Sequence, residues 1–324
     1  MLILEKFTAE VPDTNAFHWK MSELSDDNGH TVLMCGYDTT QATELHDVVA
    51  NYERKVLFNN WSPCEFSSLT DHFGMNAFQY DKFFNEVYTI CPYTADWMNS
   101  FYGYEKYKHI FYPFNKYIIP KPQDKLYDVI YHGGIHGQDH VDCLETMSKF
   151  NYRYLTMTKH INQFTVKCLP YATNVDLPFC EKIKFVAKSK ISVCYNLLHD
   201  TERHVNGVKS YQRWYDNAAH SEVGKRNVRP QFKTRMHEGA ICKTLNVVKR
   251  DTWNLAERYY EPEKEFLYFD THDELAEIIQ DVRDNWDKYQ HIVDSAYVRA
   301  MNYTTENFVR QIETGKAWKE KNEL

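Results

Sequence analysis

The segment "YDVIYHGGIHGQDHVDC", residues 127–143, holds three glycines and the evenly spaced histidines His132, His136 and His140. Histidines four residues apart lie on one face of a helix, and imidazole is a common zinc ligand, so a metal site is one interpretation. That site needs a continuous helix, and each interior glycine weakens a helix by roughly 1 kcal/mol. The glycines therefore argue against zinc.

The same glycines fit a phosphate-binding turn better than they fit a zinc-binding helix. The run "YDVIY" predicts a strand, so residues 133–137 form a turn between a strand and a helix. Backbone N–H groups at such a turn point toward an anion. We interpret the segment as a loop that contacts a diphosphate. Gly133 and Gly134 allow close approach, and His136 or Gln138 donates a hydrogen bond. A plain tight turn is the alternative.

A second cluster lies in "RPQFKTRMHEGAICKT", residues 229–244. Arg235 and Glu238 are three residues apart and share a helical face. A carboxylate accepts two hydroxyl hydrogen bonds at once, which suits the 2′- and 3′-hydroxyls of a ribose. Lys233 and Arg235 suit its diphosphate, and more positive charge lies just upstream at Lys225, Arg226 and Arg229. The alternative is a surface salt bridge where a helix begins.

The elements that must position these residues alternate along the chain. In the first half, β-branched and aromatic runs that end in Gly, Pro or Asn predict strands within residues 2–7, 31–37, 55–61, 86–92 and 109–114. Helical patterns lie between them. The segment "IIPKPQDK", residues 118–125, carries two prolines, which interrupt helices and central strands. We place a domain boundary there.

The same alternation resumes after the boundary, with strands expected at 127–134, 152–158, 190–196, 245–250 and 266–270. Two rounds of strand and helix predict an α/β protein with two Rossmann-like doubly wound domains facing across a cleft. We assign residues 1–120 to an N-terminal acceptor-side domain and 121–302 to a C-terminal nucleotide-sugar domain. Residues 303–324 are expected to form a C-terminal helix that packs back on the N-terminal domain.

Composition narrows the class of protein. The chain has 324 residues and a net charge of −7, which argues against non-specific DNA binding across the whole surface. Its eight cysteines form no CxxC pair, and the opening residues contain no secretory signal. No apolar stretch approaches the roughly 20 residues that span a bilayer, so no transmembrane segment is expected. We expect a reduced, cytoplasmic protein.

The second half resembles the donor-binding domain of a GT-B glycosyltransferase. "DVIYHGG" resembles the opening strand and glycine turn of that domain, and "TRMHEGAICKTLNVVKR" resembles its R-x-x-E helix start. Two groups are similar: the spore-maturation-type glycosyltransferases of the retaining group, and phage DNA β-glucosyltransferase. The resemblance covers residues 127–310 and implies that Glu238 holds a ribose and Arg235 the phosphates.

Several positions depart from the family pattern. Many retaining members carry a second glutamate eight residues before the ribose glutamate, where this chain has Pro230. Cys242 and Lys243 stand where a small residue and glycine are common. "FTAEVPDTNAFHW" replaces the glycine-rich first loop of the N-terminal domain. The resemblance therefore leaves the contact to the sugar unassigned, as well as the choice between retention and inversion.

The expected reaction moves a sugar from a nucleoside-diphosphate sugar to a hydroxyl of a glycan, lipid or protein. We expect Arg235 and Lys233 to stabilise the leaving diphosphate. The GT-B resemblance implies that no metal is required, and we expect no further cofactor. An inverting enzyme also needs a base, for which the candidates are Glu65, Asp71 and His72. Two alternatives stay open: transfer to hydroxymethylated bases of DNA, and a non-catalytic GT-B module that binds a nucleotide or glycan.

Overall fold

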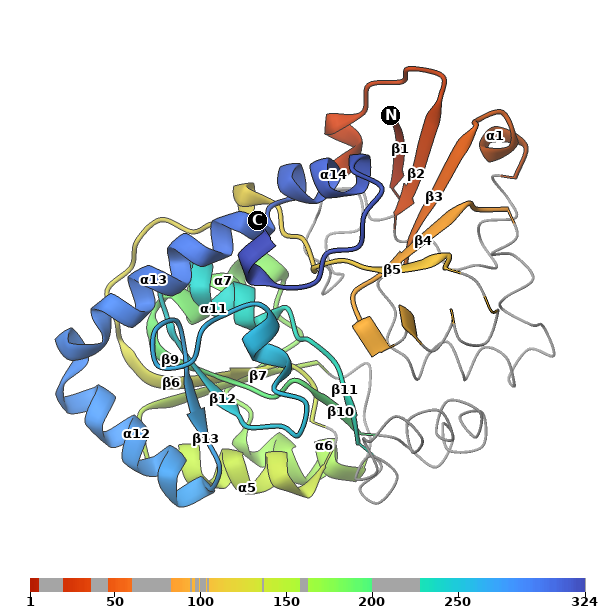
Figure 1. The fold of residues 1–324 in the computed structure, drawn as a ribbon. Coiled ribbons are helices and arrows are strands. Elements are labelled where there is room, and N and C mark those ends of the chain that lie inside the picture. The colour runs from red at the N-terminus through yellow and green to blue at the C-terminus, as the bar shows by residue number, and fades with distance from the viewer. Residues whose placement is uncertain are drawn as a thin grey trace.

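The computed structural model describes residues 1–5, 20–35, 46–59, 83–93, 95–96, 99, 103, 105–135, 137–157, 163–199 and 228–323. Within them, two parallel sheets form separate lobes, which we call the N-terminal and C-terminal lobes (Figure 1). None of the described helices combines the length and apolar character that crossing a membrane requires.

The N-terminal sheet contains five described strands in chain order: β1 (Leu2–Glu5), β2 (Thr31–Cys35), β3 (Arg54–Asn59), β4 (Glu86–Thr89) and β5 (Tyr107–His109). Every neighbouring pair is parallel. The side chains of β2 from Val32 to Cys35 are all buried, because elements cover both faces of the sheet. Two short helices accompany these strands, η1 (Met21–Leu24) and α1 (His46–Ala50).

The C-terminal sheet is also parallel, and its order is β13–β12–β9–β6–β7–β8. The strands are β6 (Tyr127–His132), β7 (Tyr152–Thr156), β8 (Asn174–Val175), β9 (Ser189–Cys194), β12 (Leu245–Lys249) and β13 (Leu267–Phe269). The chain starts in the middle at β6, builds outward to β8, and then returns to β9 on the other side. Doubly wound sheets of this order bind ligands outside the carboxyl ends of their strands.

Helices cover both faces of this sheet. Side chains of α5 (Gln138–Met147) and α12 (His272–Asp284) share one core with one face, while α7 (Phe179–Ala187) and α11 (Arg235–Ile241) pack on the other. The remaining elements of the lobe are α6 (Gln163–Cys168), η5 (Leu169–Tyr171), η6 (Leu255–Arg258), η7 (Trp286–Tyr289) and an antiparallel pair, β10 (Leu197–His199) with β11 (Val228–Pro230).

Successive side chains of β6 point to opposite faces of the sheet. Val129 and Tyr131 join the core beneath α5 and α12, whereas Ile130 joins the core beneath α7 and α11. His132, two residues after Ile130, therefore points toward α7 and α11. A histidine in the last position of a central strand thus lies at the carboxyl edge of the sheet, between two helices.

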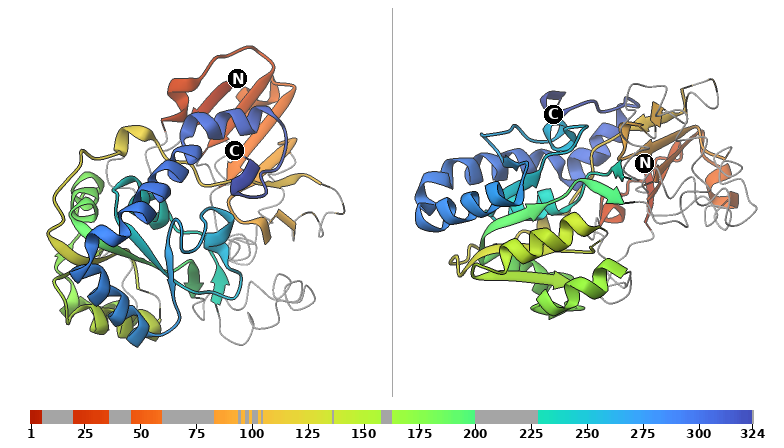
Figure 2. Two further views of the ribbon diagram at one scale, coloured as in Figure 1. Left: turned by 60° about the vertical axis from the view of Figure 1, so that its left-hand side comes forward. Right: turned by 90° about the horizontal axis from the view of Figure 1, so that it is seen from below.

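The chain crosses between the lobes twice. The first crossing follows β5 and includes η3 (Lys116–Ile118). The second is made by α13 (Gln290–Ala300), η8 (Met301–Tyr303) and α14 (Thr305–Glu313), and η9 (Lys321–Glu323) follows. The Phe308 ring of α14 lies 4.6 Å from that of Phe58 on β3, centroid to centroid. The views in Figure 2 keep α14 beside the N-terminal strands.

The predicted fold class, with two parallel α/β domains, is confirmed. In the C-terminal sheet the strand order also reverses, as double winding requires, while the five described N-terminal strands follow chain order. The strand expected at 109–114 ends at His109, because the following backbone instead meets the second crossing, where Phe114 N donates to Tyr303 O at 3.0 Å. The sequence reading missed α6 and the two-residue strand β8.

Candidate donor-binding site

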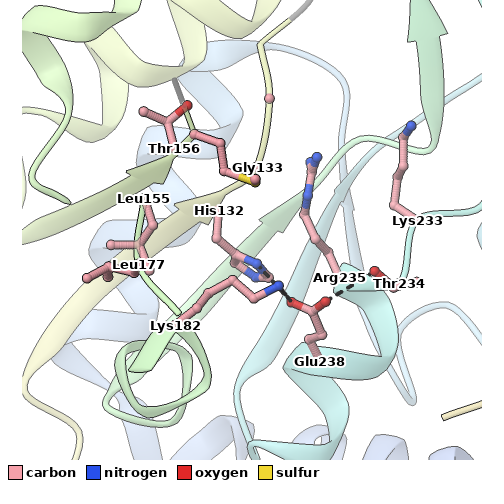
Figure 3. Close-up of a pocket in the computed structure, with 12 residues that line it drawn as sticks. His132, Gly133, Leu155, Thr156, Leu177, Lys182, Lys233, Thr234, Arg235 and Glu238 are labelled. Atoms are coloured by element: carbon pink, nitrogen blue, oxygen red, sulfur yellow. Dashed lines mark hydrogen bonds and ion pairs between the residues drawn. The ribbon is translucent and has the colours of Figure 1, made fainter. Parts of the chain in front are cut away.

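A cavity of about 140 Å³ lies at the carboxyl edge of the C-terminal sheet. The ends of β6 and β7 form one wall, and the first turns of α7 and α11 form the others (Figure 3). The side chains that contribute charge or hydrogen-bonding groups to it are His132, Thr156, Lys182, Lys233, Thr234, Arg235 and Glu238. The two sequence clusters, residues 127–143 and 229–244, therefore meet here.

The glycine turn brings backbone and cation together. Gly133 has φ +131°, a conformation that residues with a side chain rarely adopt. A Cβ atom at this position would lie 2.7 Å from Cζ of Arg235, so only glycine leaves room for the guanidinium. Gly133 N donates to Leu155 O at 2.9 Å, which continues the pairing of β6 with β7 past the strand. The guanidinium of Arg235 thus lies directly against the turn.

Close packing on β12 fixes the short helix α11. A Cβ atom on Gly239 would lie 2.9 Å from Cγ of Asn246, so the glycine allows the helix to approach this strand. Asn246 Nδ2 in turn donates to Met236 O at 2.8 Å. These contacts hold the first turn of α11, and with it Glu238, at the edge of the sheet.

Glu238 is the centre of the cavity's polar network. Its side chain is 1% exposed. Oε2 lies 2.9 Å from Lys182 Nζ and 3.1 Å from His132 Nδ1, and Oε1 accepts a hydrogen bond from Thr234 Oγ1 at 3.1 Å. A buried carboxylate needs such partners, because burial without them costs several kcal/mol.

The protonation states follow from burial and neighbours. Burial lowers the pKa of His132 to about 4, although Glu238 opposes that shift, so the ring is neutral at pH 7. Its Nδ1 lies 3.1 Å from Glu238 Oε2, and its Nε2 forms a hydrogen bond with Ser192 Oγ at 3.2 Å. Burial raises the pKa of Glu238, but Lys182 and His132 outweigh it and hold the pKa below its usual range. Glu238 is therefore ionised.

Positive charge exceeds negative charge in this cavity. Arg235 Nη1 donates to Tyr131 OH at 2.8 Å, and the guanidinium lies 4.8 Å from the centre of the Tyr131 ring. Lys182 and Lys233 also line the cavity, and Glu238 is the only carboxylate among the residues that do. Among these lining residues three cations stand beside one carboxylate, with His132 neutral, which favours an anionic ligand.

The other predicted site residues are placed as follows. Gly133 and Gly134 line the cavity. Gln138 is exposed, with its amide donating to Asp142 Oδ1 at 2.8 Å and accepting from Lys167 Nζ at 3.2 Å, and it is not among the lining residues. Four predicted residues lie outside those that the structure describes: His136, Glu65, Asp71 and His72.

The zinc interpretation finds no ligand set within the described residues, which hold no group of three or more His, Cys, Asp or Glu side chains placed for a metal. His132 contacts Glu238. The buried ring of His140 stacks on that of Tyr195, with centroids 4.2 Å apart. The two described histidines thus have separate surroundings.

Sequence reasoning missed Lys182 and the pairing of His132 with Glu238. Lys182 lies in "PFCEKIKF", an ordinary amphipathic helix start that offers no spacing signal. It reaches Glu238, 56 residues further on, only because α7 and α11 pack on the same face of the sheet. The strand order of the sheet would have been needed to predict this contact.

Comparison with known proteins agrees with the fold. A profile of the family described as glycosyl transferase-like matches residues 170–314, which is less than half of the chain. No curated protein matches the sequence.

Among solved structures, HepE from Anabaena in complex with UDP-glucose is 12% identical with a TM-score of 0.58, covering 88% of this chain and 78% of that one. Sucrose-phosphate synthase from Thermosynechococcus elongatus is 10% identical with a TM-score of 0.55, covering 88% and 72%. TarM from S. aureus, in a complex that includes UDP, is 11% identical with a TM-score of 0.53, covering 87% and 55%.

These neighbours are GT-B glycosyltransferases, and the predicted resemblance to that group is confirmed. At such low identity the structural likeness shows the fold alone. The narrower resemblance to spore-maturation-type and phage enzymes stays a prediction.

Proposed function

We propose that the chain is a glycosyltransferase that uses a nucleoside-diphosphate sugar as its donor. The observation that carries the proposal is a buried, ionised carboxylate beside three cations and a glycine turn, at the carboxyl edge of a doubly wound sheet. Glu238 provides acceptors for ribose hydroxyls, and the cations and the backbone at Gly133 provide donors for a diphosphate. HepE and TarM, which share the fold, were solved with UDP or UDP-glucose bound.

The chemistry assigned to this cavity is stabilisation of the leaving group. As the bond from the anomeric carbon to the diphosphate oxygen breaks, negative charge grows on that oxygen. Fixed cations near it lower the barrier. Arg235 is held against the turn by Tyr131, and Lys233 is held through its backbone N–H, which donates to Asn196 Oδ1 at 2.9 Å. We propose that these side chains make transfer independent of a metal, which activity in excess chelator would test.

The acceptor is proposed as a hydroxyl of a glycan, lipid or protein that enters from the side of the N-terminal lobe. Any base that removes its proton is expected among Glu65, Asp71 and His72. These roles rest on sequence position alone. Substitution of each by alanine, with donor affinity measured alongside turnover, separates a base from a donor contact, because a base affects turnover alone.

The proposal is tested by donor screening. A ligand that binds only the folded state raises the apparent unfolding temperature by mass action. We expect at least one of the UDP-, GDP-, ADP- and CMP-sugars to raise it, and the matching nucleotide to be released when an acceptor mixture is present. Binding of a nucleotide without any release of product would instead favour a non-catalytic module. No response to any nucleotide would end the proposal.

A further inference from the structure

Both oxygens of Glu238 are already engaged before any donor arrives. Oε2 has Lys182 and His132 as partners, and Oε1 has Thr234. An ionised carboxylate offers about four lone-pair sites. Lys182 Nζ and His132 Nδ1 lie against Oε2 at 2.9 and 3.1 Å, and Thr234 Oγ1 donates to Oε1, so a ribose that donates to both oxygens needs space that one of these partners occupies.

The three partners differ in their freedom to leave. His132 is on a central strand, is 1% exposed and is held on its other side by Ser192. Thr234 is the residue at which α11 begins, and its short side chain reaches only Oε1. Lys182 is different, because four methylene groups join its ammonium to α7 and its side chain is 15% exposed along the cavity. The ammonium of Lys182 is therefore the partner that can move.

A charged partner leaves only if both ions find replacements. An ammonium withdrawn from a buried carboxylate would leave two uncompensated charges, at a large cost. A donor supplies both replacements, since its ribose hydroxyls donate to Glu238 and its diphosphate accepts from the ammonium. The cavity that Lys182 lines is also the one with excess positive charge.

From this geometry we infer that Lys182 exchanges partners when the donor binds. In the empty site it neutralises Glu238, and in the occupied site its ammonium binds the diphosphate while Glu238 turns to the ribose. The inference rests on the proposed function and deepens it. It predicts that phosphate and ribose are recognised together, because a nucleoside without phosphates displaces Lys182 and offers it nothing in return.

The test uses a series of ligands that differ only in the number of phosphates. Uridine, UMP and UDP, or the same series on the base that screening selects, are titrated calorimetrically into the wild type, Lys182→Met and Lys182→Arg. We expect Lys182→Met to weaken UDP binding by about tenfold or more, since a charge-assisted hydrogen bond is lost. Uridine binding should be unchanged or tighter, and Lys182→Arg should keep most of the UDP affinity.

Lys184→Met is the matched control, because Lys184 lies on the same helix but is exposed and paired with Glu181 at 2.6 Å. It should bind all three ligands as the wild type does. If Lys182→Met weakens uridine and UDP by the same factor, Lys182 only positions Glu238. If it changes neither, Lys182 has no role. Either result overturns the inference. If the wild type binds none of the ligands in the series, the proposed function itself is overturned.

A second measurement is made on the wild type and needs only the conservative variant Lys182→Arg, for assignment. The ammonium nitrogen of Lys182, assigned in isotope-labelled wild-type protein through its loss in Lys182→Arg, is followed by NMR. A shift on addition of UDP that uridine does not produce supports the exchange. The same shift with both ligands contradicts it.

Discussion

His237 and Glu238 are neighbours on α11, and both are fully buried, yet they face opposite surroundings. Glu238 faces a cavity with surplus cations. His237 faces the junction of the lobes, where Nδ1 lies 2.7 Å from Tyr260 OH and Nε2 lies 3.1 Å from Tyr112 O. The ring also stacks on Tyr303 of the second crossing, with centroids 4.9 Å apart.

The two sides of α11 differ in how their polar and charged groups are compensated. On the junction side, burial lowers the pKa of His237 to about 3, and the neutral ring has a partner for each nitrogen. On the cavity side, Lys182, Lys233 and Arg235 line the cavity together with one carboxylate, that of Glu238. Buried or crowded charge opposes folding unless it is compensated. The cations that converge on the cavity side suit an anionic ligand.

Removal of the carboxylate is expected to have the largest effect on the cavity side. Glu238→Ala should abolish the thermal shift caused by nucleotides and lower turnover by about 100-fold or more, the size seen when a key charged group is removed from an active site. Scanning fluorimetry and a nucleotide-release assay measure both. Glu277→Ala, which removes an exposed glutamate on α12, is the control. Nucleotide shifts of equal size in both variants would remove Glu238 from the site.

A methyl group at the glycine turn should displace Arg235 without disturbing the junction. Gly133→Ala places a Cβ atom against the guanidinium and forces an alanine to φ +131°. We expect turnover to fall by about tenfold to 100-fold, because small misplacements of a positioning group have effects of that order. Backbone strain of this kind costs about 1–3 kcal/mol in stability. Steady-state kinetics with the folded variant measures this fall in turnover. Unchanged turnover would mean that Arg235 does not act on the phosphates.

The junction side should respond in the opposite way. His237→Phe keeps the aromatic volume but leaves Tyr112 O and Tyr260 OH without this partner, which should lower stability by about 2–3 kcal/mol. Urea unfolding measures the loss. In the folded variant, nucleotide affinity should stay within about threefold of the wild type, as titration calorimetry would report. A collapse of affinity with intact stability would show that the two sides of α11 are not separate.

Acid should destabilise the protein in part through the cavity side. His132 has a pKa of about 4 in the folded protein because it is buried, and about 6.5 when unfolded. The unfolded chain therefore binds more protons between these values, so stability rises with pH across this window and is lost as pH falls through it. The lowered pKa of Glu238 adds a loss in the same direction. Urea unfolding between pH 7 and pH 4 should show this slope, and His132→Gln should reduce it, while the buried His237 keeps its own share.

The smallest effect is expected at Gln138. Its amide bonds to Asp142 and Lys167 on the exposed start of α5. Gln138→Ala should change stability by no more than about 0.5 kcal/mol and leave nucleotide affinity unchanged, as is usual for surface positions. A clear loss of nucleotide affinity, measured by calorimetry, would support the hydrogen bond from Gln138 to the diphosphate that the sequence predicted.

Local chemistry made much of this molecule predictable. The apolar run before Gly133 predicted β6, and the glycine pair predicted the turn that follows it. Each of these signals lies within a few residues of the feature that it specifies.

Contacts made by tertiary packing were not predictable from spacing. The approach of Lys182 to Glu238 depends on the order of strands between α7 and α11, and the two-residue strand β8 is too short to leave a periodic signal. The alternation along β6 explains the direction of His132 only once the covering helices are known.

The central claim is that the cavity around Glu238 binds a nucleoside diphosphate. Calorimetric titration of UDP, GDP, ADP and CDP into the wild type and Glu238→Ala, with both shown to be folded by urea unfolding, tests it directly. The account predicts saturable binding of at least one nucleotide to the wild type, with an affinity at least about 100-fold weaker in the variant. Equal affinity in the two proteins, or no binding to either, would contradict it.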